Sequence, residues 1–374
     1  MNKDLTIIDF SHLSMRMLFT SISLTKPPKI KGKHPTEEYI SYWKHLLFNN
    51  LSYLQKKFKG EIIIAVDGKN NWRKKYFNKY KLSRKKHRSE SPVIWEDYYS
   101  ELDEVIQKID DYFPYKIVKY NKAEADDIAG VLSNKLGNKT NITLVTSDHD
   151  WEQCLVYNKV KLFDPIKKEY KNISTNDYKI YNTPKGEMCV FSIKHALKGD
   201  GGDDVPKLTE ETELSDNFIA YLKENELYID KASSFFNLNS DTIEKLINNY
   251  DVFKKYKSGK NKGKNKDEKD IFKTVNLGDK AIEKIVQSQE SFNQFLESHE
   301  LYNDYFKRNA TLVDFQFIPE DTQEHILNSY NNAEIHYNPM QIFQYFIDEG
   351  LSELSGKCSD FYIGEPKSSL DDFL

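Results

Sequence analysis

The sequence predicts an α/β fold, with a central, mainly parallel sheet flanked by helices and a smaller, mainly helical domain after it. Short and nearly continuous apolar runs rich in β-branched residues occur at Leu5–Ile8, Ile62–Val66 and Ile142–Val145. Such runs are typical of parallel strands that are buried on both faces. The long segments between them carry helical patterns at Tyr39–Lys57 and Tyr98–Tyr112, as βαβ crossovers require.

The rest of the chain divides into a second domain, a lysine-rich stretch and a tail. Because 374 residues exceed one typical domain, we expect an α/β domain over residues 1–200 and a smaller, mainly helical domain over residues 201–355. Strand-like runs fade from Leu214 onward and helical patterns dominate. Residues 254–269 are rich in lysine and poor in apolar side chains, which predicts a loop. Residues 356–374 lack helical periodicity, which predicts a flexible tail.

Bulk composition excludes several classes of protein. A mean hydropathy of -0.71 and 30% charged residues are typical of a charge-rich globular protein. No apolar stretch approaches a membrane-spanning length and no signal peptide precedes the first run, so we expect the protein in the cytoplasm. Its three cysteines lie far apart and show no metal-binding spacing. A GxxxxGKST loop is also missing, which argues against an NTPase.

Acidic side chains follow the three apolar runs at the points where these runs end. Asp9 follows the first run, Asp67 the second, and Asp148 and Asp150 the third. Ligands of an open parallel sheet gather beyond the carboxyl ends of its strands, so we expect these acids to meet at one edge. For any single acid, a helix cap or a loop position would be a sufficient explanation.

Two further acidic clusters lie at Glu124–Asp127 and Asp200–Asp204. Each has a structural alternative: the first suits a helix N-terminus, and the second suits a Gly/Asp turn that closes a helix. Together the clusters would leave up to nine acids at one edge, where their repulsion requires protonation or bound cations. Hard divalent ions such as Mg²⁺ meet that need. Two of them can hold a scissile phosphate, so phosphodiester hydrolysis is the predicted reaction class.

A basic and aromatic segment, called here the arch segment (residues 70–95), follows Asp67. Nine basic side chains lie between Arg73 and Arg88 without an acidic residue among them, and aromatic side chains are interleaved. A solvated helix face is the usual role of such a run, but self-repulsion favours an anionic partner. Phosphate neutralisation and base stacking explain both residue types. Lys81 and Arg84 would share a face if this part is helical, and there they could act on the scissile phosphate.

In combination these motifs resemble the flap endonuclease and 5′ to 3′ exonuclease family, and within it the ribonuclease H branch of T-even bacteriophages. The matching stretches are IIDFS, VDGKNNWRKKYFNKYKLSR, EADD, TSDHD, KGDGGDDV, YNDYFKRNATLVDFQFIP and FQYFIDEGLSEL, so the resemblance covers nearly the whole chain. It implies a PIN-like nuclease fold with a helical arch and two Mg²⁺ ions, for which Mn²⁺ can substitute. It also implies removal of RNA primers and 5′ flaps during phage DNA replication, in the host cytoplasm.

The resemblance implies roles by motif position. The first metal site would comprise Asp9, Asp67, Glu124, Asp126 and Asp148, with Asp126 as a direct ligand. The second would comprise Asp150, Asp200 and Asp203, with Asp127 between the two or in an outer shell. The expected catalytic residues are Asp126, Lys81 and Arg84. The expected contacts to nucleic acid are Arg73, Lys74, Lys75, Tyr80, Lys81, Arg84, Lys85, Lys86 and Arg88.

The chain departs from the family pattern after its last acidic cluster. Family members continue there with a glycine-rich helix-hairpin-helix, whereas the segment after Pro206 has no such glycines. VNLGDKAIEKIV, at residues 275–286, is a candidate substitute. The tail ends KSSLDDFL and resembles a sliding-clamp docking peptide through Leu370, Phe373 and Leu374, with disordered C-terminal sequence as the alternative.

The expected partners are DNA and RNA/DNA hybrids, with a sliding clamp and a single-strand DNA-binding protein as further candidates, and we expect a monomer. Two other functions stay open. A non-catalytic protein that binds branched DNA would gain from losing negative charge near phosphate, so the full acidic set argues against it. A PIN-like nuclease for single-stranded RNA would share the acids, but the long arch segment argues against that reading.

Overall fold

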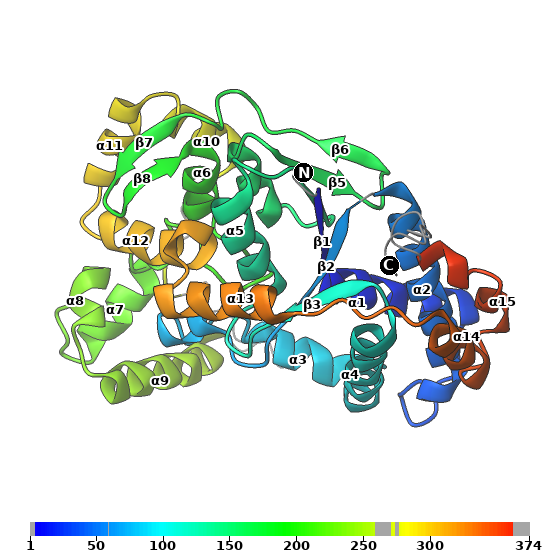
Figure 1. The fold of residues 1–374 in the computed structure, drawn as a ribbon. Coiled ribbons are helices and arrows are strands. Elements are labelled where there is room, and N and C mark those ends of the chain that lie inside the picture. The colour runs from blue at the N-terminus through cyan, green and yellow to red at the C-terminus, as the bar shows by residue number, and fades with distance from the viewer. Residues whose placement is uncertain (1–3, 59, 259–270, 274–276, 362–374) are drawn as a thin grey trace. The chain divides into compact units, whose positions relative to one another are not determined.

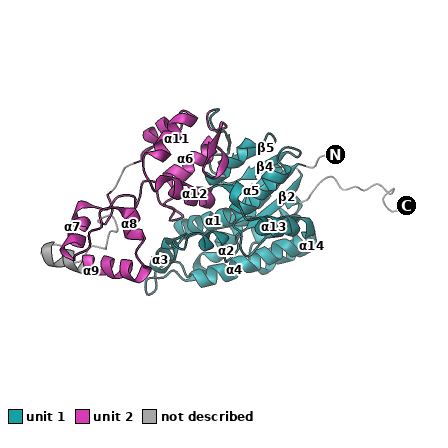
Figure 2. Cartoon of the chain, turned by 90° about the vertical axis from the view of Figure 1, so that its left-hand side faces the viewer, with its two compact units in different colours: residues 1–175, 314–374 teal, residues 176–313 magenta. Residues whose placement is uncertain are grey.

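The computed structural model describes residues 4–58, 60–258, 271–273 and 277–361. The chain forms two compact units: unit 1 comprises Met1–Thr175 and Asp314–Leu374, and unit 2 comprises Asn176–Val313 (Figure 2). It therefore divides at Thr175 rather than at the expected residue 200, and its last part belongs to unit 1. The predicted docking residues Leu370, Phe373 and Leu374 lie outside the described residues, as does the lysine-rich stretch beyond residue 258.

Unit 1 is built on a mainly parallel sheet. Among the described residues, six strands lie in the order β3-β2-β1-β4-β5-β6 (Figure 1). The strands are β1 (Leu5–Asp9), β2 (Glu61–Val66), β3 (Tyr115–Lys119), β4 (Ile142–Val145), β5 (Val160–Asp164) and β6 (Glu169–Lys171). Neighbours among β1 to β5 pair in parallel, and β6 pairs antiparallel with β5. The predicted α/β class is confirmed.

The sequence predicts only part of this sheet. The three apolar runs correspond to β1, β2 and β4. By contrast, β3 (YKIVK) and β5 (VKLFD) alternate lysine with apolar residues and form no continuous apolar run. Because β3 lies at the edge of the sheet, its exposed positions tolerate these lysines.

Helices cover both faces of the sheet, because side chains along a strand alternate between its faces. The helices of unit 1 are α1 (Phe10–Thr25), α2 (Ile40–Lys57), α3 (Ser83–Glu90), α4 (Trp95–Tyr112), α5 (Ala125–Leu136), α13 (Glu320–Asn332), α14 (Pro339–Asp348) and α15 (Ser352–Ser355). Short 3₁₀ helices are η1 (Thr36–Glu38), η2 (Trp72–Lys75), η3 (Asp150–Val156), η5 (Phe315–Phe317) and η6 (Cys358–Phe361). Ile8 and Ile64 join one core with α1, α2, α4 and α14, and Ile7 and Ile63 join the other with α5 and α13 (Figure 1).

Specific contacts hold the C-terminal part of the chain in unit 1. A Cβ atom at Gly130 of α5 would lie only 2.6 Å from the Phe315 side chain, so glycine permits a close approach of η5 to α5. In η6, Phe361 is buried in the core, and Lys56 of α2 forms an ion pair of 2.7 Å with Asp360. The first residues of the expected tail therefore form a packed element.

Unit 2 is mainly helical, as the sequence predicts for the C-terminal half. Its hairpin consists of β7 (Ile180–Thr183) and β8 (Gly186–Cys189). Its helices are α6 (Val190–Lys198), α7 (Asp216–Glu224), α8 (Ala232–Phe236), α9 (Ser240–Ser258), α10 (Asp279–Ile285), α11 (Gln289–Glu297) and α12 (Tyr302–Val313). Because α9 extends to Ser258, residues 254–258 of the expected loop are helical. No helix among the described residues is long and apolar enough to cross a membrane.

Within unit 2, three helices form a subdomain with its own core, called here the α7–α9 subdomain (residues 214–258 and 271–272). Its core contains Phe218, Phe235 and Tyr250 in ring contact. Leu214 and Phe272 form an antiparallel bridge, beside which Ser215 N donates to Ile271 O at 2.7 Å and Lys273 N donates to Glu213 O at 2.8 Å. The chain therefore enters and leaves this subdomain at adjacent points.

Candidate metal centre and arch base

Asp9 is held by the strand that it ends and by the neighbouring strand β4. Its carboxylate caps α1 by accepting a hydrogen bond of 3.0 Å from His12 N. The hydroxyl of Thr146 donates to Asp9 Oδ2 at 2.9 Å and accepts from Asp148 N at 3.0 Å. One buried hydroxyl therefore ties together the acids that follow β1 and β4.

The acids after β2 and at the start of α5 are fixed in a similar way. Asp67 Oδ1 accepts a hydrogen bond of 2.8 Å from Ala125 N, which joins the end of β2 to the first turn of α5. The indole of buried Trp151 donates to Asp126 Oδ1 at 2.7 Å. Strand ends and a helix N-terminus thus deliver the acids to one edge of the sheet, as the topology predicts.

The charges of these acids act on one another. Burial, followed by the negative charges of Asp67 and Asp148, raises the pKa of Asp9 from 3.8 to about 7. Loss of hydration and the charge of Glu124 raise the pKa of Asp67, although part of this residue remains exposed. Burial and Asp148 raise the pKa of Asp126 well above its usual range. Like charges at this density are the condition that a bound cation relieves.

This crowding predicts a stability that depends on both metal and pH. Because the folded-state pKa of Asp9 exceeds its ordinary value, folding takes up a proton, and metal-free protein should lose stability as the pH rises from about 4 through about 7. Thermal melts in EDTA should therefore give a lower melting temperature at about pH 8 than at about pH 5, and Mg²⁺ should restore more stability at the higher pH. A melting temperature in EDTA that rises over this interval would contradict the prediction.

Glu124 caps α5 and lies under the base of the arch segment. Lys81 Nζ lies 2.6 Å from Glu124 Oε1, and the Tyr80 hydroxyl donates to Oε2 at 3.0 Å. The guanidinium of Arg73 lies 3.7 Å from the same Oε2. Burial alone would raise the pKa of Glu124, but Lys81 and Arg73 lower it to about 2. Because this pKa lies far below about pH 5, the charge of Glu124 stays constant in the melts described above.

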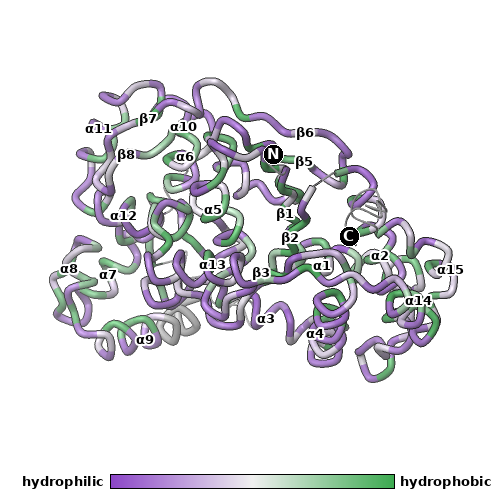
Figure 3. Tube along the Cα trace, in the orientation of Figure 1, coloured by the Kyte–Doolittle hydropathy of each residue, from purple (hydrophilic) through white to green (hydrophobic). Residues whose placement is uncertain are grey.

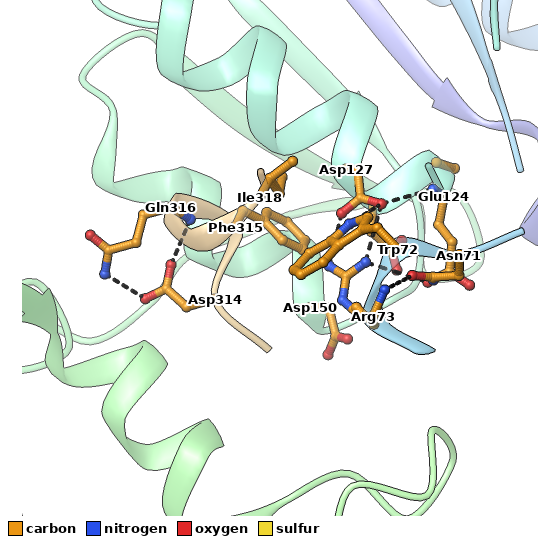
Figure 4. Close-up of polar contacts among 12 residues, drawn as sticks. Asn71, Trp72, Arg73, Glu124, Asp127, Asp150, Asp314, Phe315, Gln316 and Ile318 are labelled. Atoms are coloured by element: carbon orange, nitrogen blue, oxygen red, sulfur yellow. Dashed lines mark hydrogen bonds and ion pairs between the residues drawn. The ribbon is translucent and has the colours of Figure 1, made fainter. Parts of the chain in front are cut away.

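Arg73 and Asp127 face each other in the interior (Figure 4). The guanidinium Nη2 lies 2.8 Å from Asp127 Oδ1, and Nη1 donates to Oδ2 at 3.1 Å. Their side chains are 2% and 0% exposed. Arg73 is expected to contact nucleic acid and Asp127 to bind metal, but the two side chains form an ion pair with each other. A buried guanidinium requires such a counter-ion.

The other expected nucleic-acid contacts of the arch segment differ in exposure. Those that reach solvent are Lys74, Lys75, Arg84, Lys85, Lys86 and Arg88, whereas Tyr80 is buried. The helix α3 is hydrophilic along its length (Figure 3). It begins only at Ser83, and Lys81 before it has a left-handed φ of 55°. The condition for a common helical face of Lys81 and Arg84 is therefore not met, because Lys81 lies before the helix and the chain turns between the two residues.

Asp150 and the last acidic cluster lie in different units. Asp150 begins η3 in unit 1, and its backbone N–H donates to Asp148 Oδ1 at 3.0 Å. In unit 2, Asp200 and Val205 close a turn through backbone hydrogen bonds of 2.9 and 2.8 Å. This turn contains Asp203, which is buried. The structure thus places Asp200 and Asp203 together on the turn that follows α6.

Three polar residues around these acids have no place in the sequence prediction. They are Thr146, Trp151 and Asn309 of α12, whose amide donates to Ala196 O at 2.9 Å and Pro206 O at 2.8 Å on either side of the Asp200 turn. Thr146 directly follows an apolar run, so its position could have indicated a role. Trp151 and Asn309 carry no comparable signal, because only the fold brings them to the acids.

Two solved structures similar to this chain are of T5 proteins. The T5 D15 protein co-crystallised with metal ions is 14% identical and covers 96% of this chain and 99% of its own, with a TM-score of 0.45. A T5 5′-exonuclease with bound zinc ions is 16% identical, covering 89% of this chain and 100% of its own, with a TM-score of 0.46.

Sequence comparison finds a similar phage protein and two matching domain models. Ribonuclease H of Enterobacteria phage T4 is 26% identical over 364 residues, covering 95% of both chains. Residues 4–182 match the family model of the 5′-3′ exonuclease N-terminal resolvase-like domain, and residues 268–361 match that of the T4 RNase H C-terminal domain. The chain thus carries a match to the N-terminal domain of 5′-3′ exonucleases followed, in the same chain, by a match to the C-terminal domain of T4 RNase H.

Proposed function

We propose that this nuclease removes RNA primers and 5′ flaps during phage DNA replication, by Mg²⁺-dependent hydrolysis of phosphodiester bonds. The observation that carries the proposal is the gathering of Asp9, Asp67, Asp126 and Asp148 at one edge of a parallel sheet, where hydrogen bonds with Thr146, Ala125 and Trp151 hold them. These acids come from separate strand ends and from one helix N-terminus. The match of residues 4–182 to the 5′-3′ exonuclease N-terminal domain supports the same reaction class.

The donor set fits divalent metal ions. It consists of carboxylates, the ligands that Mg²⁺ and Mn²⁺ prefer, and the pKa values of Asp9 and Asp126 are raised by burial and by the charges of neighbouring acids. Asp9, Asp67, Asp126 and Asp148 would hold a first ion, with Glu124 beside them. Asp150 in unit 1 and Asp200 with Asp203 in unit 2 are the remaining proposed ligands. When bound, such ions lower the pKa of a water and stabilise the leaving oxygen.

The arch segment supplies the cations in this proposal. Exposed Arg84, Lys85 and Lys86 on α3 would bind the phosphate backbone without regard to sequence. Lys81 lies nearer the acids and neutralises Glu124. It is the side chain best placed to exchange that carboxylate for a phosphate oxygen during the reaction.

Unit 2 is the proposed contact for the duplex part of the substrate. Its helix α10 contains most of the candidate substitute for the helix-hairpin-helix, of which residues 275 and 276 lie outside the described residues. Ion pairs of 2.9 Å between Lys198 and Asp279 and of 2.6 Å between Lys194 and Glu283 join α10 to α6. The two helices are thus neighbours despite their separation in sequence.

Replacing Lys81 with Ala should slow turnover by about 10²-fold, because the phosphate would lose a cation in the transition state. The slope of log DNA affinity against log salt concentration should also become shallower, by less than the slope of about 1 that one phosphate contact contributes. Single-turnover rates and binding titrations over a series of salt concentrations measure both effects. Lys85→Ala on the exposed face of α3 is the control and should change the salt slope more than the rate. A salt slope for Lys81→Ala equal to that of the unaltered protein would contradict the arch assignment.

Two labelled substrates test the proposed function as a whole. A 5′-labelled flap and an RNA/DNA hybrid should both release short 5′ products with Mg²⁺ and none with EDTA. Binding of the flap without any product would favour the non-catalytic alternative. Cleavage of single-stranded RNA in preference to both substrates would favour a PIN-like ribonuclease.

A further inference from the structure

We propose that Arg73 is a positioning residue of this nuclease, acting through Glu124, and that Asp127 is its counter-ion rather than a metal ligand. Together with Trp72 and Tyr80, these two residues form what we call the arch-base network. The inference rests on the proposed function and adds to it a physical link between the arch segment and the acidic site.

The hydrogen bonds of Asp127 are the first observation. Its carboxylate receives two contacts from Arg73, at 2.8 and 3.1 Å, and a hydrogen bond of 3.2 Å from the Trp72 indole. The backbone N–H of Glu124 donates to Asp127 Oδ2 at 2.8 Å. Three of these donors converge on Oδ2, Arg73 Nη2 faces Oδ1, and the residue is fully buried, so the carboxylate is already surrounded by protein donors. A metal ion would have to displace buried donors, whereas Asp9 and Asp126 each accept fewer contacts from the protein.

The surroundings of Arg73 are the second observation. Its guanidinium lies 4.6 Å from the ring centroid of Trp72 and 5.8 Å from that of Tyr80. It is 2% exposed, whereas the neighbouring Lys74 reaches solvent. The guanidinium is therefore buried against aromatic rings and paired with a carboxylate, so its binding partners are already supplied by the protein. Direct contact with a DNA backbone would require this site to open.

Glu124 connects the network to the reaction. Its backbone N–H is held by Asp127, and its carboxylate is held by Tyr80 and Lys81, with Arg73 close by. Reciprocal side-chain bonds between Glu124 and Asp127 form the capping box of α5. Asp126 projects from this same first helical turn. The network therefore sets the orientation of the turn that presents two of the acids.

Arg73→Met tests this role, because methionine keeps much of the apolar volume but leaves Asp127 without a counter-ion. We expect kcat to fall by about 10- to 100-fold, as for other groups that orient metal ligands, with KM little changed. The melting temperature should also fall, because an unpaired buried carboxylate is destabilising. Rates are measured at a temperature at which every variant is folded.

The double variant Arg73→Met with Asp127→Asn provides the decisive comparison. Asparagine keeps an oxygen that can accept from Trp72 and Glu124 N but removes the buried charge. We therefore expect the double variant to recover the melting temperature and most of kcat relative to Arg73→Met alone. If Arg73→Met does not fold, Asp127→Asn alone and the double variant replace it. In that case Asp127→Asn should be the less stable of the two, because it leaves Arg73 without its counter-ion.

Lys74→Met is the matched control, since it makes the same substitution at the adjacent exposed position. It should lower the salt slope of DNA binding by about 1 and leave the melting temperature unchanged, whereas Arg73→Met should leave the salt slope unchanged. A lowered salt slope in Arg73→Met, or a double variant as impaired as Arg73→Met, would overturn the proposal. The melting temperatures report on the pairing even if the unaltered protein fails to cut a flap, so the two proposals can fail separately.

Discussion

Asp126→Asn should nearly abolish cleavage, lowering the single-turnover rate by roughly 10³-fold or more, while DNA affinity changes little. Burial and the charge of Asp148 raise the pKa of Asp126, so its negative charge is what a metal ion would compensate. Asparagine keeps an oxygen that can accept from Trp151 Nε1 and has nearly the same shape. The variant therefore removes charge and preserves the surrounding hydrogen bond.

A labelled 5′ flap with Mg²⁺ gives the rate, and fluorescence titration in EDTA gives the affinity. Asp103→Asn is the matched control, because Asp103 is half exposed, pairs with Lys69 and Lys119, and is not one of the proposed metal ligands. It should cleave at the rate of the unaltered protein. A rate for Asp126→Asn within about tenfold of that control would refute the assignment of Asp126 as a ligand.

Gly68→Ala should destabilise unit 1 by about 3 kcal/mol, at the upper end of what an added methyl group does in a packed site. A Cβ atom at Gly68 would lie 2.2 Å from Tyr120 O and 2.4 Å from Asn121 O, both of which are backbone atoms that cannot rotate away. Gly68 N also donates to Ala123 O at 2.7 Å. Separating these segments would move Asp67 away from the N-terminus of α5.

Urea denaturation measures the loss of stability, and the shift in melting temperature on adding Mg²⁺ measures the damage to the acidic site. In Gly68→Ala, the urea concentration at the midpoint of denaturation and the Mg²⁺-induced shift in melting temperature should both be smaller than in the unaltered protein. Gly356→Ala is the control, since a Cβ atom there meets nothing within 4 Å and the backbone is right-handed. Equal denaturation midpoints for the two variants would show that the loop after β3 yields to the added methyl group.

The sequence indicates the convergence of the acids better than it indicates their separate roles. Asp9, Asp67 and Asp148 each follow an apolar run, and parallel strands carry such positions to one edge of a sheet. The spacing of residues is sufficient for that inference because it depends only on strand direction. Recognised motifs then supply Glu124 and Asp126, which lie at the start of a helix.

Burial within the arch segment is what the sequence does not reveal. Arg73 and Lys74 are adjacent cations in the same basic run, yet one is buried and the other is exposed. The difference arises from the aromatic neighbours of Arg73 and from Asp127, which is distant in sequence and arrives only through the fold. Likewise, the return of residues after Asp314 to unit 1 depends on the fit of Phe315 against Gly130.

The bridge between Leu214 and Phe272 has a consequence for how this nuclease can change over time. The matched family domains end at residue 182 and resume at residue 268, so most of the α7–α9 subdomain falls in the stretch between them. Since its two ends are already hydrogen-bonded neighbours, related proteins could lengthen, shorten or exchange this stretch while the helices on either side keep their places, at a small entropic penalty. The acids at the edge of the unit 1 sheet lie outside this stretch, so such changes would leave them in place.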